Sequence, residues 1–154
     1  MIRHSFVALL LAMTLAAPAQ SDPSNALHVR KDPSCGCCAE WASLMQQAGF
    51  DVTMTDVPNG ELARLKAASG ITPDLASCHT ATIEGYVIEG HVPAQDIKRL
   101  LAERPAALGL SAPGMPIGSP GMGPEATREA YEVLLIGEDG QTEVFSSYPA
   151  GAGG

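Results

Sequence analysis

The residues with the most distinctive chemistry in this chain are four cysteines, which form two short clusters. Cys35, Cys37 and Cys38 fall within four consecutive positions, and Cys78 is followed directly by His79. Three thiols so close together cannot all form disulfides with one another, and adjacent cysteines pair poorly for steric reasons. Thiolate sulfur is the preferred ligand of Cu(I) and a good ligand of Zn(II). The two clusters therefore predict a site for a soft metal ion.

The number of donors favours copper over zinc. A tetrahedral zinc site uses four ligands, and one built from three cysteines and a histidine usually shows a second well-spaced cysteine pair, which this chain lacks. The five donors of Cys35, Cys37, Cys38, Cys78 and His79 are enough for several Cu(I) ions bridged by sulfur. Copper, as Cu(I), is the predicted ion, and zinc in a structural module is an alternative.

Two other uses of the cysteines stay open. Cys35 and Cys38 form a Cys-x-x-Cys pair, which is typical of thiol–disulfide oxidoreductases. A third cysteine inside that pair would scramble its disulfide, which argues against exchange chemistry. The remaining interpretation is purely structural bridges, for example Cys35 with Cys38 and Cys37 with Cys78, as is common in exported proteins.

Three further residues are weaker candidates for metal ligands. His91 follows a predicted strand and either reaches the rim of the site or caps the next helix. Met115 and Met122 recur in two similar Pro-Gly-Met segments. Thioether sulfur binds Cu(I) but hardly binds zinc, although methionine more often fills apolar gaps.

Several other residues are expected to have ordinary structural roles. Trp41, Met45 and Met54 lie on apolar faces and are predicted to be core residues. Glu84 and Glu89 flank a predicted hairpin and are expected to be solvated. No Ser/His/Asp arrangement and no phosphate-binding loop is present in the sequence.

The predicted elements follow a thioredoxin-like α/β order, βαβα-ββα, with an added C-terminal β-hairpin and a Pro/Gly/Met-rich loop. In that order, the loop before the third strand faces the N-terminus of the first helix, so Cys78 and His79 should lie opposite the first cysteine cluster. Cysteines at a helix N-terminus are favoured as thiolates, the form that binds metal. The expected ranges are a strand at 26–31, a helix at 37–48 capped by Ser34, a strand at 50–57, a helix at 60–69, a hairpin at 80–89, a helix from Pro93, an irregular segment at 104–124 and a hairpin at 131–145.

The N-terminal segment of the chain predicts export. Residues 1–19 have a basic start, an apolar run and a small-x-small cleavage motif, which together indicate a signal peptide. A single domain is expected over 26–148, with a disordered tail at 149–154 and no membrane span after cleavage. The net charge of −8 argues against nucleic acid or an anionic membrane as a partner.

Four segments of the chain resemble a known family. Residues 31–38, 77–80, 85–93 and 113–122 read KDPSCGCC, SCHT, GYVIEGHVP and PGMPIGSPGM. In this order they resemble the CopG-like family of periplasmic copper-resistance proteins, catalogued as a metal-binding domain of unknown function. The resemblance implies a thioredoxin-like fold, a periplasmic location and a cluster of Cu(I) ions held by the Cys-x-Cys-Cys and Cys-His motifs. It also implies a role in interconverting Cu(I) and Cu(II).

The leading functional hypothesis is a periplasmic protein that sequesters Cu(I) and contributes to copper resistance. It would limit copper toxicity directly or pass the ion to a periplasmic copper chaperone or to efflux components. This makes the chain a metal-binding protein rather than an enzyme; as an enzyme it would be an oxidoreductase acting on copper or thiols. A thiol–disulfide oxidoreductase using Cys35 and Cys38 is the alternative.

Overall fold

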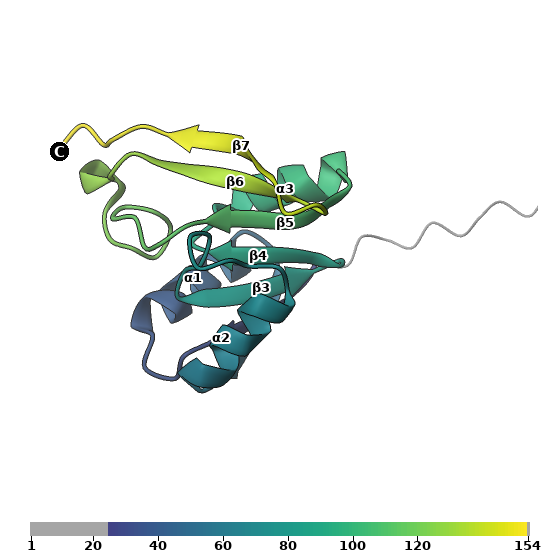
Figure 1. Cartoon of the computed structure of the whole chain (residues 1–154). Coiled ribbons are helices and arrows are strands. Elements are labelled where there is room, and N and C mark those ends of the chain that lie inside the picture. Colours follow the sequence, from purple (N-terminus) through teal and green to yellow (C-terminus); the bar gives the residue numbers. More distant parts are fainter. Residues whose placement is uncertain (1–24, 154) are drawn as a thin grey trace, which may run out of the picture.

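The computed structural model describes residues 25–153 (Figure 1). The expected signal peptide at 1–19 lies outside the described residues. The single domain at 26–148 and the disordered tail stay predictions; in the described part of the tail, the amide of Gly151 donates to the Arg128 carbonyl. None of the helices within 25–153 is long and apolar enough to cross a membrane.

Seven strands and three α-helices make up the described part of the chain, together with one short 3₁₀ helix, η1. Up to the third helix, the observed order of strands and helices confirms the predicted order βαβα-ββα. The elements are β1 (Ala26–Lys31), α1 (Gly36–Gln47), β2 (Asp51–Asp56), α2 (Asn59–Ala68), β3 (His79–Ile83), β4 (Tyr86–Gly90), α3 (Ala94–Glu103), β5 (Ala107–Ala112), η1 (Glu125–Thr127), β6 (Tyr131–Gly137) and β7 (Thr142–Tyr148).

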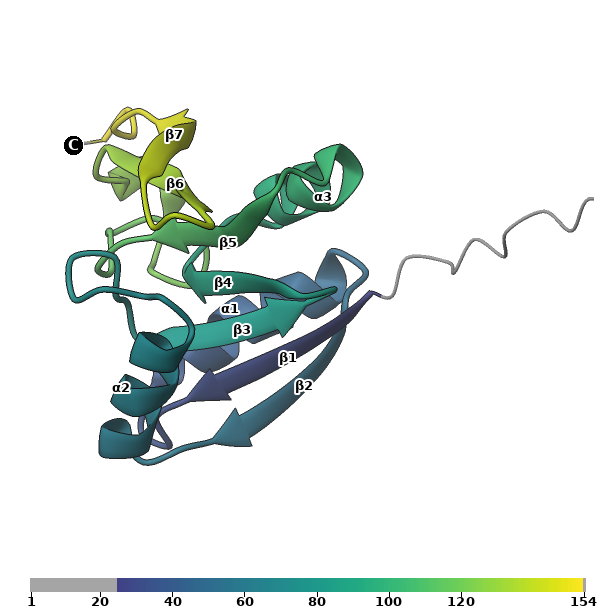
Figure 2. The ribbon, with the colours of Figure 1, turned by 45° about the vertical axis from the view of Figure 1, so that its right-hand side comes forward.

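The strands form one mixed sheet in the order β2-β1-β3-β4-β5-β6-β7, which confirms the α/β class. The β1–β2 and β4–β5 pairs are parallel and the other pairs are antiparallel. Figure 2 shows the strands in this order from bottom to top, with α1 and α3 behind the sheet and α2 in front. Helices on both faces allow strands β3 and β4 to be almost fully buried.

Apolar side chains form two clusters, one on each face of the sheet. The larger cluster lies between the sheet and helices α1 and α3, and it includes Trp41, Met45 and Ile88. A smaller cluster on the α2 side includes Ile71 and Val87. Because successive side chains of a strand point to opposite faces, Val87 and Ile88 join different clusters.

The prediction that Trp41 and Met45 are core residues is confirmed, whereas the same prediction for Met54 is wrong. Met54 is 46 % exposed. It lies on β2, which is an edge strand among the strands of residues 25–153, where it pairs with β1 alone; most of its side chains are exposed. An apolar residue in a strand pattern therefore does not by itself show that its strand is covered.

The prediction of an irregular segment over 104–124 is wrong in its first part, where residues 107–112 form β5. This strand runs parallel to β4 after the crossover helix α3 and pairs on its other side with β6. Its sequence, ALGLSA, is poor in β-branched residues, so propensity does not reveal it. A side chain in place of Gly109 would collide with the Val87 backbone, so this strand requires its glycine.

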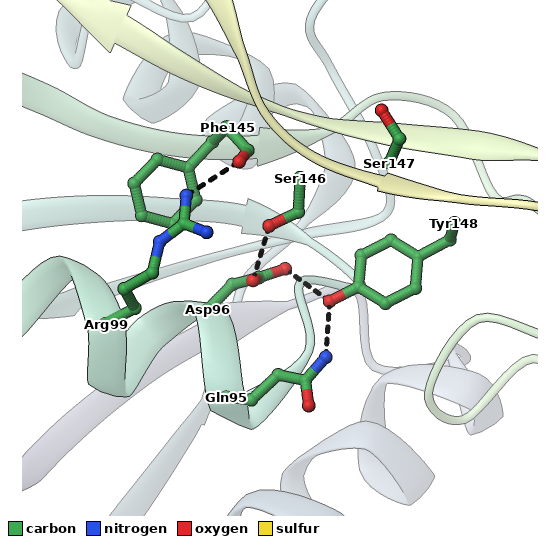
Figure 3. Close-up of a pocket in the computed structure, with 7 residues that line it drawn as sticks. All are labelled: Gln95, Asp96, Arg99, Phe145, Ser146, Ser147 and Tyr148. Carbon is green, nitrogen blue, oxygen red and sulfur yellow. Dashed lines mark hydrogen bonds between the residues drawn. The ribbon is translucent and has the colours of Figure 1, made fainter.

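The C-terminal hairpin is attached to α3 by a network of polar contacts (Figure 3). The buried carboxylate of Asp96 accepts hydrogen bonds of 2.7 Å from both the Ser146 and the Tyr148 hydroxyls. The guanidinium of Arg99 donates to the Phe145 carbonyl and lies 3.5 Å from the centre of the Phe145 ring. Burial is the larger cause and the hydrogen bond to Asp96 the second cause of a raised pKa of about 12 for Tyr148. The hydroxyl therefore keeps its proton and donates to Asp96.

This network predicts a large effect of removing one hydroxyl. Tyr148→Phe leaves one oxygen of the Asp96 carboxylate without its donor. We expect the free energy of unfolding to fall by about 1–3 kcal/mol, as measured by urea denaturation. Ser147→Ala, at the exposed neighbouring position, should change it by less than about 0.5 kcal/mol. Equal losses in the two variants would contradict this account.

Candidate metal centre

A tight turn organised by Asp32 places the first cysteine cluster. The Asp32 carboxylate accepts a hydrogen bond from the Ser34 amide at 2.8 Å, and the Asp32 carbonyl accepts one from the Cys35 amide at 3.0 Å. Cys35 occupies the N-cap position of α1, so the prediction of Ser34 as the cap is wrong. The side chain of Ser34 instead bonds to Asp32. All three cysteines of the cluster thus lie at the N-terminus of α1.

The sulfur atoms of the two clusters converge. Cys35 and Cys38 form a disulfide, while Cys37 and Cys78 carry free thiols. The Cys37 sulfur lies 3.4 Å from that of Cys35 and 4.0 Å from that of Cys78. All four sulfur atoms lie within 4.8 Å of one another. Once the Cys35–Cys38 disulfide is reduced, four sulfurs this close together could bind soft metal ions through shared thiolates.

A second group of donors meets the first at Cys78. The Cys78 sulfur lies 3.5 Å from Nδ1 of His79 and 3.0 Å from Nε2 of His91. Of the two placements considered for His91, the structure supports the one at the site, where its side chain is fully buried. Six candidate ligands therefore converge on one region, with Cys78 common to both groups.

The ring of His91 is held in an orientation suited to metal binding. Its Nδ1 lies 2.7 Å from the Pro120 carbonyl oxygen, which can only accept, so Nδ1 carries the proton. In the neutral ring Nε2 then presents its lone pair to the Cys78 sulfur. Carbonyl groups fix the ligating histidines of many metal sites in this way.

His79 is fully buried beside the Trp41 ring, whose centre lies 4.4 Å from that of the imidazole. Burial, the nearby His91 ring and the Lys66 ammonium hold the pKa of His79 well below its usual range. Burial also lowers the pKa of His91. Nε2 of His79 is a buried nitrogen with no hydrogen-bond partner among the described residues. Both rings are therefore neutral near pH 7, the state in which imidazole binds metal ions.

The Cys78 thiol is strongly disfavoured as a free thiolate. Burial, and then the proximity of Cys37, raise its pKa to about 11. Near neutral pH it keeps its proton until a metal ion displaces it, so metal binding at Cys78 should release a proton.

The Pro/Gly/Met-rich loop lies against this site. Besides the Pro120 carbonyl, Gly121 approaches α1 so closely that a Cβ there would lie 2.8 Å from the Trp41 amide nitrogen. Met115 is 54 % exposed and Met122 is half-buried. Packing in an apolar gap therefore does not explain Met115, and its thioether is accessible to an ion in solution.

One neighbour of the site was not foreseen in the sequence. Glu89 is fully buried, and its carboxylate lies 2.5 Å from the Lys66 ammonium. The expectation that Glu89 is solvated is wrong because α2 covers this face of β4. Two features of the sequence could have indicated this buried pair. Glu89 is a charged residue within an apolar strand, and Lys66 lies on α2, the helix that precedes the cysteine–histidine loop.

The buried imidazoles predict that the metal-free protein becomes less stable as the pH falls. An unfolded histidine titrates near pH 6.5, whereas both folded rings have lower pKa values, so below about pH 6.5 the unfolded chain binds more protons. We expect the free energy of unfolding to decrease from pH 7.5 to 5.5, with a slope of up to about 1.4 kcal/mol per pH unit for each histidine. Urea denaturation of the parent and of His79→Gln measures this, and the variant should show a shallower slope. Identical slopes would contradict the burial of a neutral imidazole.

The chain is similar to one described protein family and to two solved structures. Residues 75–122 match a family described as a protein of unknown function, DUF411. Comparison with curated proteins gives no match. Two solved structures of the copper resistance protein CopG, Form 1 and Form 2, are 39 % and 40 % identical to the chain, with TM-scores of 0.77 and 0.74. They align with 84 % and 80 % of this chain and with 100 % and 98 % of their own. The chain belongs to the CopG-like family of copper-resistance proteins.

Proposed function

We propose that the protein binds Cu(I) between the N-terminus of α1 and the Cys78–His79 loop, and so contributes to copper resistance. The observation that carries this proposal is the convergence of four cysteine sulfurs within 4.8 Å, joined at Cys78 to two buried imidazoles. The CopG structures that the chain resembles are described as copper resistance proteins, which supports copper as the ion.

The number and type of the candidate ligands favour several Cu(I) ions over a single zinc ion. Thiolate and imidazole are soft or borderline ligands, and a thiolate can bridge two Cu(I) ions. The proposed ligands are Cys35, Cys37, Cys38, Cys78 and His79, with His91 added by its contact with Cys78. A zinc ion would use four of these donors and leave the others unused.

The disulfide would control how much copper is bound. Sulfurs joined as Cys35–Cys38 are not available as thiolates. A dithiol reductant must first supply two electrons, breaking the S–S bond and becoming a disulfide itself, before either sulfur binds copper. Cys37, Cys78 and the two histidines remain as donors in the disulfide form. We therefore expect the reduced protein to bind more copper ions than the oxidised protein.

The setting of this function is the periplasm. The signal-peptide pattern at 1–19 supports export, after which the domain at 26–148 would act as one thioredoxin-like unit carrying an additional hairpin. The strand order and the antiparallel β1–β3 pair support this assignment. A periplasmic copper chaperone or efflux component would deliver or receive the ion. Oxidation of bound Cu(I) to Cu(II) would need an external acceptor of one electron per ion, and the reverse step an external one-electron donor.

The first prediction for this function concerns the bridging thiol. Cys78→Ser should lower both the number of Cu(I) ions bound per reduced protein and their affinity, because it removes the sulfur common to both donor groups. Anaerobic Cu(I) titration against a chromophoric chelator measures both quantities. His28→Gln, an exposed histidine on β1, should change neither. An unchanged copper count in Cys78→Ser would show that the two clusters do not share ions.

A second prediction concerns the methionine loop. Replacing Met115 and Met122 with leucine should speed the loss of Cu(I) to a chelator by roughly threefold, because two weak thioether ligands are removed while the apolar volume is conserved. Met54→Leu changes an exposed methionine of β2 and should leave the rate unaltered. Equal rates in the double variant and the parent would limit the loop to a structural role.

The observed disulfide also favours a second candidate function, thiol–disulfide exchange through Cys35 and Cys38. An insulin-reduction assay separates the two functions. Rapid insulin reduction by the parent, together with full copper affinity in Cys37→Ser, would favour the oxidoreductase. A parallel Zn(II) titration tests the structural zinc module, which predicts tight binding of one zinc ion and weak binding of Cu(I).

A further inference from the structure

A single buried carboxylate supports the cysteine–histidine loop from the α2 side of the sheet. Glu89 lies on β4 directly opposite Thr80 of β3. One of its oxygens accepts a hydrogen bond of 2.6 Å from the Ser77 amide, and the other accepts one of 2.6 Å from the Thr80 hydroxyl. Ser77 and Thr80 are the residues immediately before and after the Cys78–His79 pair. The carboxylate thus holds the pair on both sides without touching either member.

Lys66 of α2 completes this arrangement. Its ammonium lies 2.5 Å from the Glu89 oxygen that receives the Ser77 amide, and it donates to the Thr80 hydroxyl at 2.9 Å. Both charged side chains are almost completely buried. A buried carboxylate needs such a counter-ion and several donors to remain ionised.

Stability alone does not explain a buried ion pair at this position. Replacing both members of such a pair with apolar residues is often neutral or stabilising, so a buried pair is weak evidence of a stabilising role. Here the hydrogen bonds instead fix a backbone amide and a hydroxyl on either side of two candidate ligands. Gly90, next to Glu89, admits the Ser77 side chain, where a Cβ would collide with it.

We propose that Glu89, with Lys66 as its counter-ion, is the positioning residue of the metal centre and holds Cys78 and His79 opposite the cysteines of α1. Its role is to fix the loop in the metal-free protein, so that the ligands converge before an ion arrives. Pre-positioned ligands lose less conformational freedom on binding, which slows the release of the ion. The copper part of this inference rests on the proposed function, whereas the fixing of the loop does not.

Two double variants isolate the hydrogen bonds from the charges. Lys66→Met with Glu89→Gln keeps an oxygen that accepts from the Ser77 amide, and Lys66→Met with Glu89→Leu removes it. Neither variant leaves an unpaired buried charge. In a background of Cys35→Ser, Cys37→Ser and Cys38→Ser, Cys78 is the sole thiol, and its alkylation by iodoacetamide in the metal-free protein reports how firmly the loop is held.

We expect Cys78 to react about tenfold faster in the leucine variant than in the glutamine variant, which should stay within about twofold of its background. Urea denaturation should show both variants folded. Arg104→Gln with Glu84→Gln removes the ion pair beside the turn of the β3–β4 hairpin, away from Cys78, and should not change the reactivity of Cys78. Equal alkylation rates in the glutamine and leucine variants would overturn the proposal.

With all four cysteines present and reduced, the leucine variant should also lose Cu(I) to a chelator about tenfold faster than the glutamine variant. A difference in alkylation without a difference in copper loss would uphold the fixing of the loop but overturn its role in the metal centre, whereas the Cu(I) titration of Cys78→Ser decides separately whether Cys78 is a ligand. If the leucine variant does not fold, Thr80→Val decides, because it keeps the ion pair and the Ser77 hydrogen bond. Faster alkylation of Cys78 in Thr80→Val supports the proposal, and an unchanged rate contradicts it.

Discussion

The antiparallel pairing of Lys31 with His79 is the constraint on which the rest of the site depends. Lys31 is the last residue of β1 and leads into the Asp32 turn and the cysteines of α1, whereas His79 is the first residue of β3 and follows Cys78. One step of the ladder therefore brings together two motifs about forty residues apart. A shift of one residue in this register would turn His79 to the α2 face, away from Trp41. The register of the sheet thus decides whether the donors meet.

The same burial that gathers the donors sets their protonation. Both imidazoles are kept neutral and ready to bind, but the Cys78 thiol is kept protonated. An ion that binds strongly to sulfur can displace that proton, whereas an ion with little affinity for sulfur cannot. Burial therefore favours soft ions over hard ones. The Pro120 carbonyl strengthens this preference because it fixes His91 with Nε2 toward the sulfur.

Most of the fold was predictable from local patterns, because its early elements have clear boundaries. Periodicity and turn residues located every element from β1 to α3 to within one or two residues. The strand that was missed, β5, depends on long-range contacts, because it is held as a strand by its pairing with β4 on one side and β6 on the other. Met54 and Glu89 were misjudged for the same reason, since the exposure of a strand residue depends on which helix covers it.

The candidate ligands were predictable to a similar extent. Residue type and spacing identified the four cysteines and His79, and the thioredoxin-like order predicted that the two clusters would meet. His91 remained ambiguous because its place beside Cys78 depends on a carbonyl group at Pro120, far along the chain. The Lys66–Glu89 pair was missed because its two sequence signals are weak: an isolated lysine on a helix and an isolated glutamate on a strand are usually solvated.

The most direct test of the central claim is a crystal structure of the reduced, Cu(I)-loaded protein, with copper located from anomalous scattering. The account predicts copper between the two clusters, with at least one ion bound to the Cys78 sulfur and to a sulfur of α1, each at about 2.3 Å, a typical metal–thiolate distance. Copper bound by the α1 cysteines alone, with Cys78 and both histidines free of metal, would contradict it.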